Sequence, residues 1–162
     1  MNVYWLNRDY FYIAPWRCLP EKSKKMLLSL HDKDAMFQGK KVLLVDDDIR
    51  NIFSLSAVLE ERGMFVMTAS NGQEALEQLK SVRVNNVDLI ITDIMMPGMD
   101  GLELIKLIRA EDCYFSLPII ALTAKAMKED RHRCLEAGAS DYLTKPVDVD
   151  RLLSMLHVWL YR

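Results

Sequence analysis

The sequence has few cysteines, little net charge and no long hydrophobic run. Its three cysteines, Cys18, Cys113 and Cys134, are far apart, and no pair has the spacing of metal ligands, which favours reduced thiols in a cytoplasmic protein. Arg8 and Asp9 interrupt the apolar core that a signal peptide needs, and no run is long enough to cross a bilayer. The formal net charge of -2 gives no electrostatic reason to expect nucleic acid or an anionic membrane as a partner.

The composition is that of a soluble globular protein, with 162 residues of which 51% are hydrophobic and 27% charged. Residues 1–38 lack the regular hydrophobic pattern of the rest of the chain. They are too few to form a hydrophobic core of their own, so they are not expected to be a second domain. They hold a cluster of aromatic side chains, namely Tyr4, Trp5, Tyr10, Phe11, Tyr12 and Trp16. We expect an aromatic-rich extension or linker over 1–38 and one domain over 39–162; the extension is either a poorly ordered tail, the remnant of a longer protein, or a docking segment.

Short β-prone runs alternate with helical patterns throughout residues 39–162. The runs predict strands over 42–45, 64–69, 88–92, 117–122 and 141–144. An apolar pattern with helical spacing follows each of them. Strict alternation predicts an α/β fold, a five-stranded parallel sheet with helices on both faces, doubly wound and flavodoxin-like, with strand order 2-1-3-4-5.

Three helix starts carry capping signals. Asn71 with Glu74, and Asp100 with Glu103, have the spacing of a capping box. Asp48 has two interpretations, a helix cap or a third acid of a metal site, and the cap is favoured.

Polar groups end four of the expected strands. They are the run 46–48, Asp93, Thr123 and Lys145. Because the carboxyl ends of parallel strands lie along one edge of a sheet, these groups are expected to meet there. A carboxylate cluster, a hydroxyl and an ammonium group on separate strands form a more specific signal than isolated acids.

The chemistry of such a cluster is restricted. Two carboxylates about 4 Å apart repel by about 4 kcal/mol at an effective dielectric constant of ~20, so the cluster holds either a proton or a cation. Oxygen ligands with an open position suit Mg²⁺. The metal, Lys145 and Thr123 would together balance the charge on a phosphoryl group, and Asp93 is placed to be the nucleophile.

The motifs resemble those of the receiver domain of two-component response regulators, most closely the receivers of hybrid sensor histidine kinases. The resemblance covers Lys40 to about Trp159. It rests on the segments Val45-Asp46-Asp47-Asp48, Asp93-Ile94-Met95-Met96-Pro97-Gly98-Met99-Asp100-Gly101, Leu122-Thr123-Ala124 and Tyr142-Leu143-Thr144-Lys145-Pro146.

The resemblance implies a phosphoacceptor site with Mg²⁺ as cofactor. Asp93 would accept the phosphoryl group from a phosphohistidine. Asp47, Asp93 and the backbone carbonyl of Met95 would ligate the metal directly, while Asp46 would hold it through water.

The resemblance also implies a switch. Lys145, in a cis peptide bond with Pro146, would pair with the carboxylate and then with the phosphate. Thr123 would hydrogen-bond a phosphate oxygen, and Tyr142 would change position as Thr123 moves. The phosphoryl group would shift the population of two conformations.

The implied partners are a histidine kinase, a histidine phosphotransfer protein, or both, and a weak dimer is left open. A donor helix would dock on residues drawn from Ile49, Arg50, Ile52 and Phe53, part of which must be core.

Such a signalling module catalyses its own phosphorylation and slow dephosphorylation but turns over no free metabolite. Two alternatives stay open. One is a true enzyme, a haloacid dehalogenase-like phosphohydrolase that uses Asp46 and Asp48. The other is a pseudo-receiver that acts only as an interaction surface.

Overall fold

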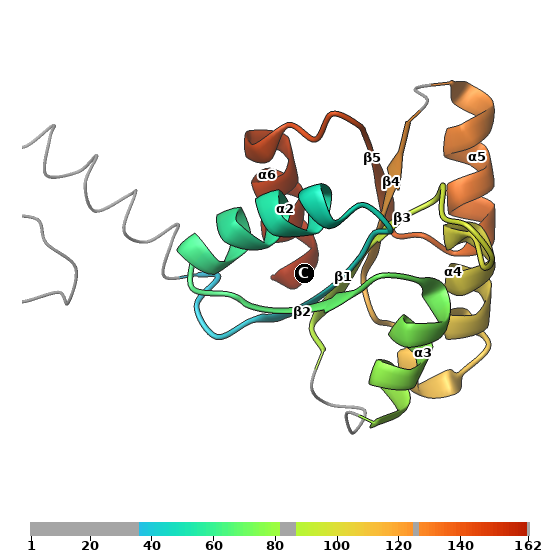
Figure 1. The fold of residues 1–162 in the computed structure, drawn as a ribbon, viewed down its shortest axis with the longest axis horizontal. Helices are drawn as coiled ribbons and strands as arrows, with labels where there is room; N and C mark the ends of the chain where they lie inside the picture. The colour runs from blue at the N-terminus through green and yellow to red at the C-terminus, as the bar shows by residue number, and fades with distance from the viewer. Residues whose placement is uncertain (1–35, 82–86, 125–126, 162) are drawn as a thin grey trace, which may run out of the picture.

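The computed structural model describes residues 36–81, 87–124 and 127–161. The aromatic cluster expected in the N-terminal extension lies outside these residues. In the described part, strands and helices alternate as the sequence predicts (Figure 1). The strands are β1 (Lys41–Val45), β2 (Phe65–Ala69), β3 (Leu89–Asp93), β4 (Ile119–Thr123) and β5 (Asp141–Thr144). The helices are α2 (Ile49–Glu61), α3 (Gly72–Ser81), α4 (Gly101–Arg109), α5 (Lys128–Ala137) and α6 (Val149–Leu160).

The five strands form one parallel sheet in the order β2-β1-β3-β4-β5. This order confirms the doubly wound, flavodoxin-like prediction. It reverses direction between β1 and β3, where Val45 pairs with Thr92. In open sheets of this kind, ligands bind beyond the carboxyl ends of the strands next to such a reversal. A ligand site is therefore expected beside the residues that follow β1 and end β3.

Helices cover both faces of the sheet (Figure 1). The central strands are buried on both sides, as expected for β-branched runs in a parallel sheet. Leu43 and Val45 of β1 pack with the cluster under α3, α4 and α5, whereas Val42 and Leu44 pack with the cluster under α2 and α6. This alternation follows the two-residue period of a strand. Phe37, just before β1, is buried in the second cluster.

Acidic side chains cap three of the helices, and two of these caps, Asp48 and Asp100, are predicted from the sequence. Asp48 accepts a hydrogen bond of 2.9 Å from the Arg50 amide at the start of α2. Asp100 accepts one of 2.8 Å from the Glu103 amide at the start of α4. At the start of α6, Asp148 accepts one of 3.0 Å from the Arg151 amide. The caps satisfy amides that have no partner inside the helix.

The capping box at α3 forms only in part. The Glu74 amide donates a hydrogen bond of 2.8 Å to the side chain of Asn71, as expected. The carboxylate of Glu74, however, accepts from the amide and the hydroxyl of Ser70, at 2.8 and 2.7 Å, and not from the Asn71 amide. The serine competes successfully because it offers two donors to one carboxylate.

A 3-10 helix, η2 (Asp112–Tyr114), joins α4 to β4 and was not expected from the sequence. Its Tyr114 is buried, and the phenol donates a hydrogen bond of 2.7 Å to the carbonyl of Leu79 at the end of α3. A segment this short has no apolar period to reveal it.

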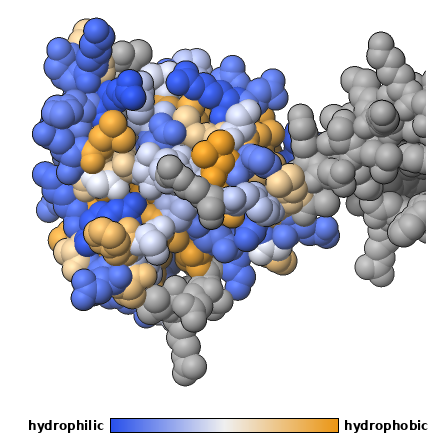
Figure 2. Space-filling view, turned by 180° about the vertical axis from the view of Figure 1, so that it is seen from behind, coloured by the Kyte–Doolittle hydropathy of each residue, from blue (hydrophilic) through white to orange (hydrophobic). Residues whose placement is uncertain are grey.

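Hydrophobic residues on the face seen in Figure 2 lie in separate patches among hydrophilic ones. Among the described residues, the exposed large hydrophobic side chains are Ile49, Phe53, Phe65, Met95, Leu107, Phe115, Met127, Leu135, Val158 and Tyr161. None of the helices in the described ranges combines the length and the apolar character that a membrane span requires.

Candidate functional site

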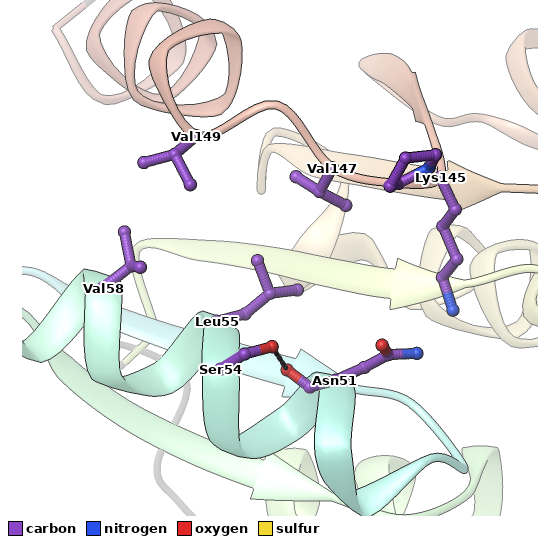
Figure 3. Close-up of a pocket in the computed structure, with 8 residues that line it drawn as sticks. Asn51, Ser54, Leu55, Val58, Lys145, Val147 and Val149 are labelled. Carbon is purple, nitrogen blue, oxygen red and sulfur yellow. Dashed lines mark hydrogen bonds between the residues drawn. The ribbon is translucent and has the colours of Figure 1, made fainter.

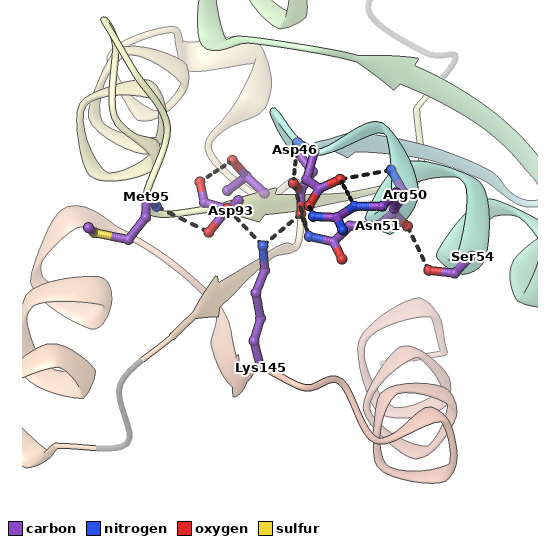
Figure 4. Close-up of polar contacts among 9 residues, drawn as sticks. Asp46, Arg50, Asn51, Ser54, Asp93, Met95 and Lys145 are labelled. Atoms are coloured by element: carbon purple, nitrogen blue, oxygen red, sulfur yellow. Dashed lines mark hydrogen bonds and ion pairs between the residues drawn. The ribbon is translucent and has the colours of Figure 1, made fainter.

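Lys145, which follows β5, contacts acidic side chains at the ends of β1 and β3 (Figure 4). Its ammonium nitrogen lies 2.8 Å from Oδ2 of Asp46 and 2.8 Å from Oδ2 of Asp93. Asp46 directly follows β1, Asp93 ends β3, and Lys145 directly follows β5. The sequence placed these three groups at one edge of the sheet, and the structure brings them into contact.

Both carboxylates of this contact are buried. Asp46 is 0% exposed and Asp93 is 4% exposed. Burying a carboxylate is costly unless a compensating charge and hydrogen-bond donors accompany it. Lys145 supplies the charge, and the backbone amide of Met95 donates a hydrogen bond of 3.1 Å to Oδ1 of Asp93. The two oxygens of Asp93 are thus held by different donors, which fixes the plane of its carboxylate.

The electrostatics of the site keep Lys145 charged. Burial by itself would lower its pKa, but the hydrogen bonds to Asp46 and Asp93 and their negative charges outweigh this effect and raise the pKa. Lys145 therefore carries a positive charge at any physiological pH. The Lys145–Pro146 peptide bond is cis, as the resemblance implies.

Asp47 completes a cluster of three carboxylates. One oxygen each of Asp46, Asp47 and Asp93 lies within 4.8 Å of the other two. Asp47 is exposed, in contrast to its two neighbours. An oxygen-only donor set that is buried on one side and open to water on the other fits Mg²⁺, which binds few carboxylates and keeps several waters. The sequence expectation named the same three acids.

Asp46 has a further contact that the sequence did not reveal. Its Oδ1 accepts a hydrogen bond of 2.8 Å from the Asp48 amide, and the amide nitrogen of Asn51 lies 3.3 Å from Oδ1 and 3.2 Å from Oδ2. Asn51 belongs to the first turn of α2. The five-residue separation crosses a loop and a helix start, so no strand or helix period points to it. An asparagine soon after an acidic strand end was the one available signal.

The remaining expected residues lie around this cluster. Thr123 is buried at the end of β4, one residue beyond Leu122, the residue that pairs with Asp93. Its carbonyl accepts a hydrogen bond of 2.7 Å from the Lys145 amide. Met95 is 68% exposed, and its backbone amide is the group that bonds Asp93.

Tyr142 lies in β5 and is partly buried. The guanidinium carbon of Arg131, on α5, lies 5.7 Å from the centre of its ring, a cation–π distance. Apart from Cys134 and Ala137, the side chains of α5 are not buried. The Tyr142 ring thus lies next to α5, a helix with few buried side chains.

Asp48 takes no part in the carboxylate cluster. Besides capping α2, it forms an ion pair with Arg50 at 2.7 Å. The hydrogen bonds from the side chain and the backbone of Arg50 lower the pKa of Asp48 to about 2. The hydrolase alternative needs Asp46 and Asp48 as its acid pair. Because Asp48 pairs with Arg50 and lies outside the cluster of Asp46, Asp47 and Asp93, the structure gives that alternative no support.

A groove runs from the site along α2 (Figure 3). Its volume is about 300 Å³. Next to it on the same helix, Ile49 is 73% exposed and Phe53 is 76% exposed, whereas Ile52 is buried in the core. The groove is lined by Asn51, Ser54, Leu55 and Val58 of α2 and by Lys145, Pro146, Val147 and Val149.

Comparison with known proteins gives a consistent result. The family model of the response regulator receiver domain matches residues 42–157. The heme response regulator HssR of Staphylococcus haemolyticus is 38% identical over 122 residues, which cover 75% of this chain and 52% of that protein. The signal transduction histidine-protein kinase BarA of Escherichia coli is 34% identical over 150 residues, which cover 89% of this chain and 16% of that protein. The chain thus spans about half of the first of these relatives and much less of the second.

Solved structures agree with this result. The chemotaxis protein CheY4 of Vibrio cholerae superposes with a TM-score of 0.70 at 36% identity, covering 75% of this chain and 99% of that one. The receiver domain of the sensor histidine kinase PA1611 from Pseudomonas aeruginosa, solved with a magnesium ion coordinated in its active site cleft, gives a TM-score of 0.69 at 35% identity. That match covers 76% of this chain and 99% of that one.

Proposed function

This chain belongs to the family of response regulator receiver domains of two-component systems, and from this premise we propose that it accepts a phosphoryl group on Asp93. The observation that carries the proposal is the contact of Lys145 with both Asp46 and Asp93, with Asp47 beside them. A buried carboxylate that is held by a lysine next to two further acids has the surroundings of a nucleophile and not of a structural ion pair.

We propose that Asp46, Asp47 and Asp93 hold Mg²⁺. Their donor set fits that ion, and the receiver of PA1611, which resembles this chain, contains magnesium in its active site cleft. When bound, the ion would offset the repulsion among the carboxylates and between them and an incoming phosphoryl group. The backbone carbonyl of Met95 is proposed as a further ligand.

The proposed reaction is a phosphoryl transfer from a phosphohistidine. A carboxylate oxygen of Asp93 attacks phosphorus, a phosphorus–oxygen bond forms, and the phosphorus–nitrogen bond to the imidazole breaks. The released imidazole nitrogen takes up a proton from water. Lys145 stays within reach of the transferred group and balances its charge, and Thr123 is proposed to hydrogen-bond one of its oxygens.

Tyr142 is proposed as the residue that follows Thr123 when the domain changes conformation. Tyr142 belongs to β5 and lies beside α5, a helix with few buried side chains. This position supports the role, since few buried contacts oppose a movement of the ring there.

The partners proposed are a histidine kinase, a histidine phosphotransfer protein, or both; the receiver family works with these proteins. The exposed Ile49 and Phe53, beside the groove that leads to Lys145, would contact a helix that carries the phosphohistidine. The similarity to the kinase BarA supports a relay within a hybrid kinase. Residues 39–162 are proposed as the receiver domain and 1–38 as its extension or linker.

The proposal is tested by incubating the protein with Mg²⁺ and acetyl phosphate or phosphoramidate and then measuring its intact mass. One phosphoryl group is expected per chain, lost on treatment with base. Asp93→Asn should abolish the adduct, whereas Asp150→Asn, a matched change of an exposed acid in α6, should not. An unmodified wild-type protein would favour the pseudo-receiver, and steady phosphate release that depends on Asp46 would favour the hydrolase.

A further inference from the structure

The side-chain amide of Asn51 faces both oxygens of the Asp46 carboxylate (Figure 4). Its nitrogen lies 3.3 Å from Oδ1 and 3.2 Å from Oδ2. An ionised carboxylate can only accept hydrogen bonds, so the contact identifies the NH₂ group of the amide as the side that faces Asp46.

Asp46 depends on few donors. Oδ1 accepts from the Asp48 amide and from Asn51, and Oδ2 accepts from Lys145 and from Asn51. The side chain is completely buried, so water cannot readily replace a lost donor. Asn51 is the donor that touches both oxygens, and it thereby opposes rotation of the carboxylate about its last bond.

We propose that Asn51 is a positioning residue of the magnesium site, which holds Asp46 in the orientation that the ion requires. The inference rests on the proposed function, because it concerns the same site. Outer groups that orient a metal-binding carboxylate commonly change metal affinity by ~10- to 100-fold when they are removed. Asn51 occupies such a position toward Asp46.

The location of Asn51 also suits this role. It lies in the first turn of α2. Its backbone N–H donates a hydrogen bond of 3.0 Å to the Asp48 carbonyl, so its backbone is held close to the end of β1. Its side chain is only partly buried and lines the groove, outside both hydrophobic clusters. Replacing it should therefore leave the core intact and act on Asp46.

The experiment is a titration of the full chain with Mg²⁺ by isothermal calorimetry. Asn51→Leu, which keeps the volume and removes the donor, is expected to raise the Kd by ~10- to 100-fold. Asn51→Ala, with a strong helix former, serves as a second replacement. Ser54→Ala is the matched control: Ser54 lines the same groove, and its hydroxyl bonds the Asn51 carbonyl but not Asp46.

A second measurement separates positioning from helix stability. The rate of acyl phosphate formation is followed against Mg²⁺ concentration. A positioning role raises the half-saturating concentration and leaves the rate at saturating metal within about threefold of wild type. A role in stability alone would lower the Tm and leave the Kd of the folded protein unchanged.

The outcomes are distinguishable. If the wild type binds Mg²⁺ and both Asn51 variants bind it within about twofold of wild type, the inference on Asn51 is wrong and the proposed function stands. If the wild type itself binds no Mg²⁺ and forms no acyl phosphate, the proposed function fails and the inference falls with it.

Discussion

Lys145, which directly follows β5, reaches across the end of β4 and donates a hydrogen bond of 2.8 Å to Asp93, the last residue of β3. The two residues are far apart in the sequence, and only the strand order β3-β4-β5 brings them together. The side chain of Lys145 thus links the end of β5 to the ends of β1 and β3, two strands that do not pair with β5 in the sheet.

The ammonium group of Lys145 should stabilise the folded protein. Lys145→Met leaves two buried carboxylates without their positive partner and should lower the free energy of unfolding by about 1–3 kcal/mol in the absence of Mg²⁺. Adding Mg²⁺ should restore part of the loss. Urea denaturation measures both effects. Lys106→Met, at an exposed position of α4, should change stability by less than about 0.5 kcal/mol; an equal loss in both variants would contradict the assignment.

The stabilisation that Lys145 provides should depend on pH in a defined way. The folded pKa of Lys145 is raised above 10.5, because the hydrogen bonds to Asp46 and Asp93 outweigh its burial. Its contribution is therefore fully present below the unfolded pKa and is lost only as the pH rises through the raised folded value. The stability difference between wild type and Lys145→Met should stay constant from about pH 6 to about pH 9. A difference that shrinks as the pH rises toward about 9 would show that Lys145 loses its charge there.

Glu74 should show the opposite pH dependence. Hydrogen bonds from the amide and the hydroxyl of Ser70 lower its pKa below 4.5. A lowered pKa stabilises the fold above the unfolded value, and the contribution is lost as the pH falls through the folded value. Glu74→Gln keeps an oxygen acceptor for Ser70 but removes the charge, so it should cost only about 0.2–1 kcal/mol at neutral pH, and the difference should vanish in acid. Glu77→Gln, on the same helix but exposed, provides the control in the same denaturation experiment.

The sequence predicted the strands and most helix starts because each carries a local signal. The run Leu89-Ile90-Ile91 is apolar on both faces, and Asp100 and Asp148 cap the helices that follow them. The convergence of Asp46, Asp93 and Lys145 followed from parallel strands alone. What the pattern could not supply was side-chain direction: nothing in the spacing shows that Asn51 turns toward Asp46, or that Glu74 prefers Ser70 to Asn71.

Gly101 should tolerate no side chain. A Cβ there would collide with the carbonyl oxygen of Asp93 and lie 2.8 Å from the Cα of Ile94. Gly101→Ala must therefore displace the end of β3, with an expected loss of about 1–3 kcal/mol and weaker binding of Mg²⁺. Gly98→Ala, in the same loop, meets no atom within 4 Å and has only the cost of a positive φ. It should leave Mg²⁺ binding unchanged; calorimetric titration of both variants decides the point.

Arg109 should stabilise the end of the sheet opposite the site. Its guanidinium donates to the carbonyls of Gly138 and Tyr114, at 2.9 and 2.7 Å, and lies 3.4 Å from the Ser140 hydroxyl. Burial lowers the pKa of Arg109, yet arginine stays charged at neutral pH. Arg109→Met should thus cost about 1.5–3 kcal/mol, because two partly buried hydrogen bonds to backbone carbonyls lose their charged donor. Since β4 and β5 begin here and the carboxylate cluster lies at their other end, the Kd for Mg²⁺ should not change. The exposed Arg133→Met is the control, and a large effect of Arg109→Met on Mg²⁺ binding would show that the two ends of the sheet are coupled.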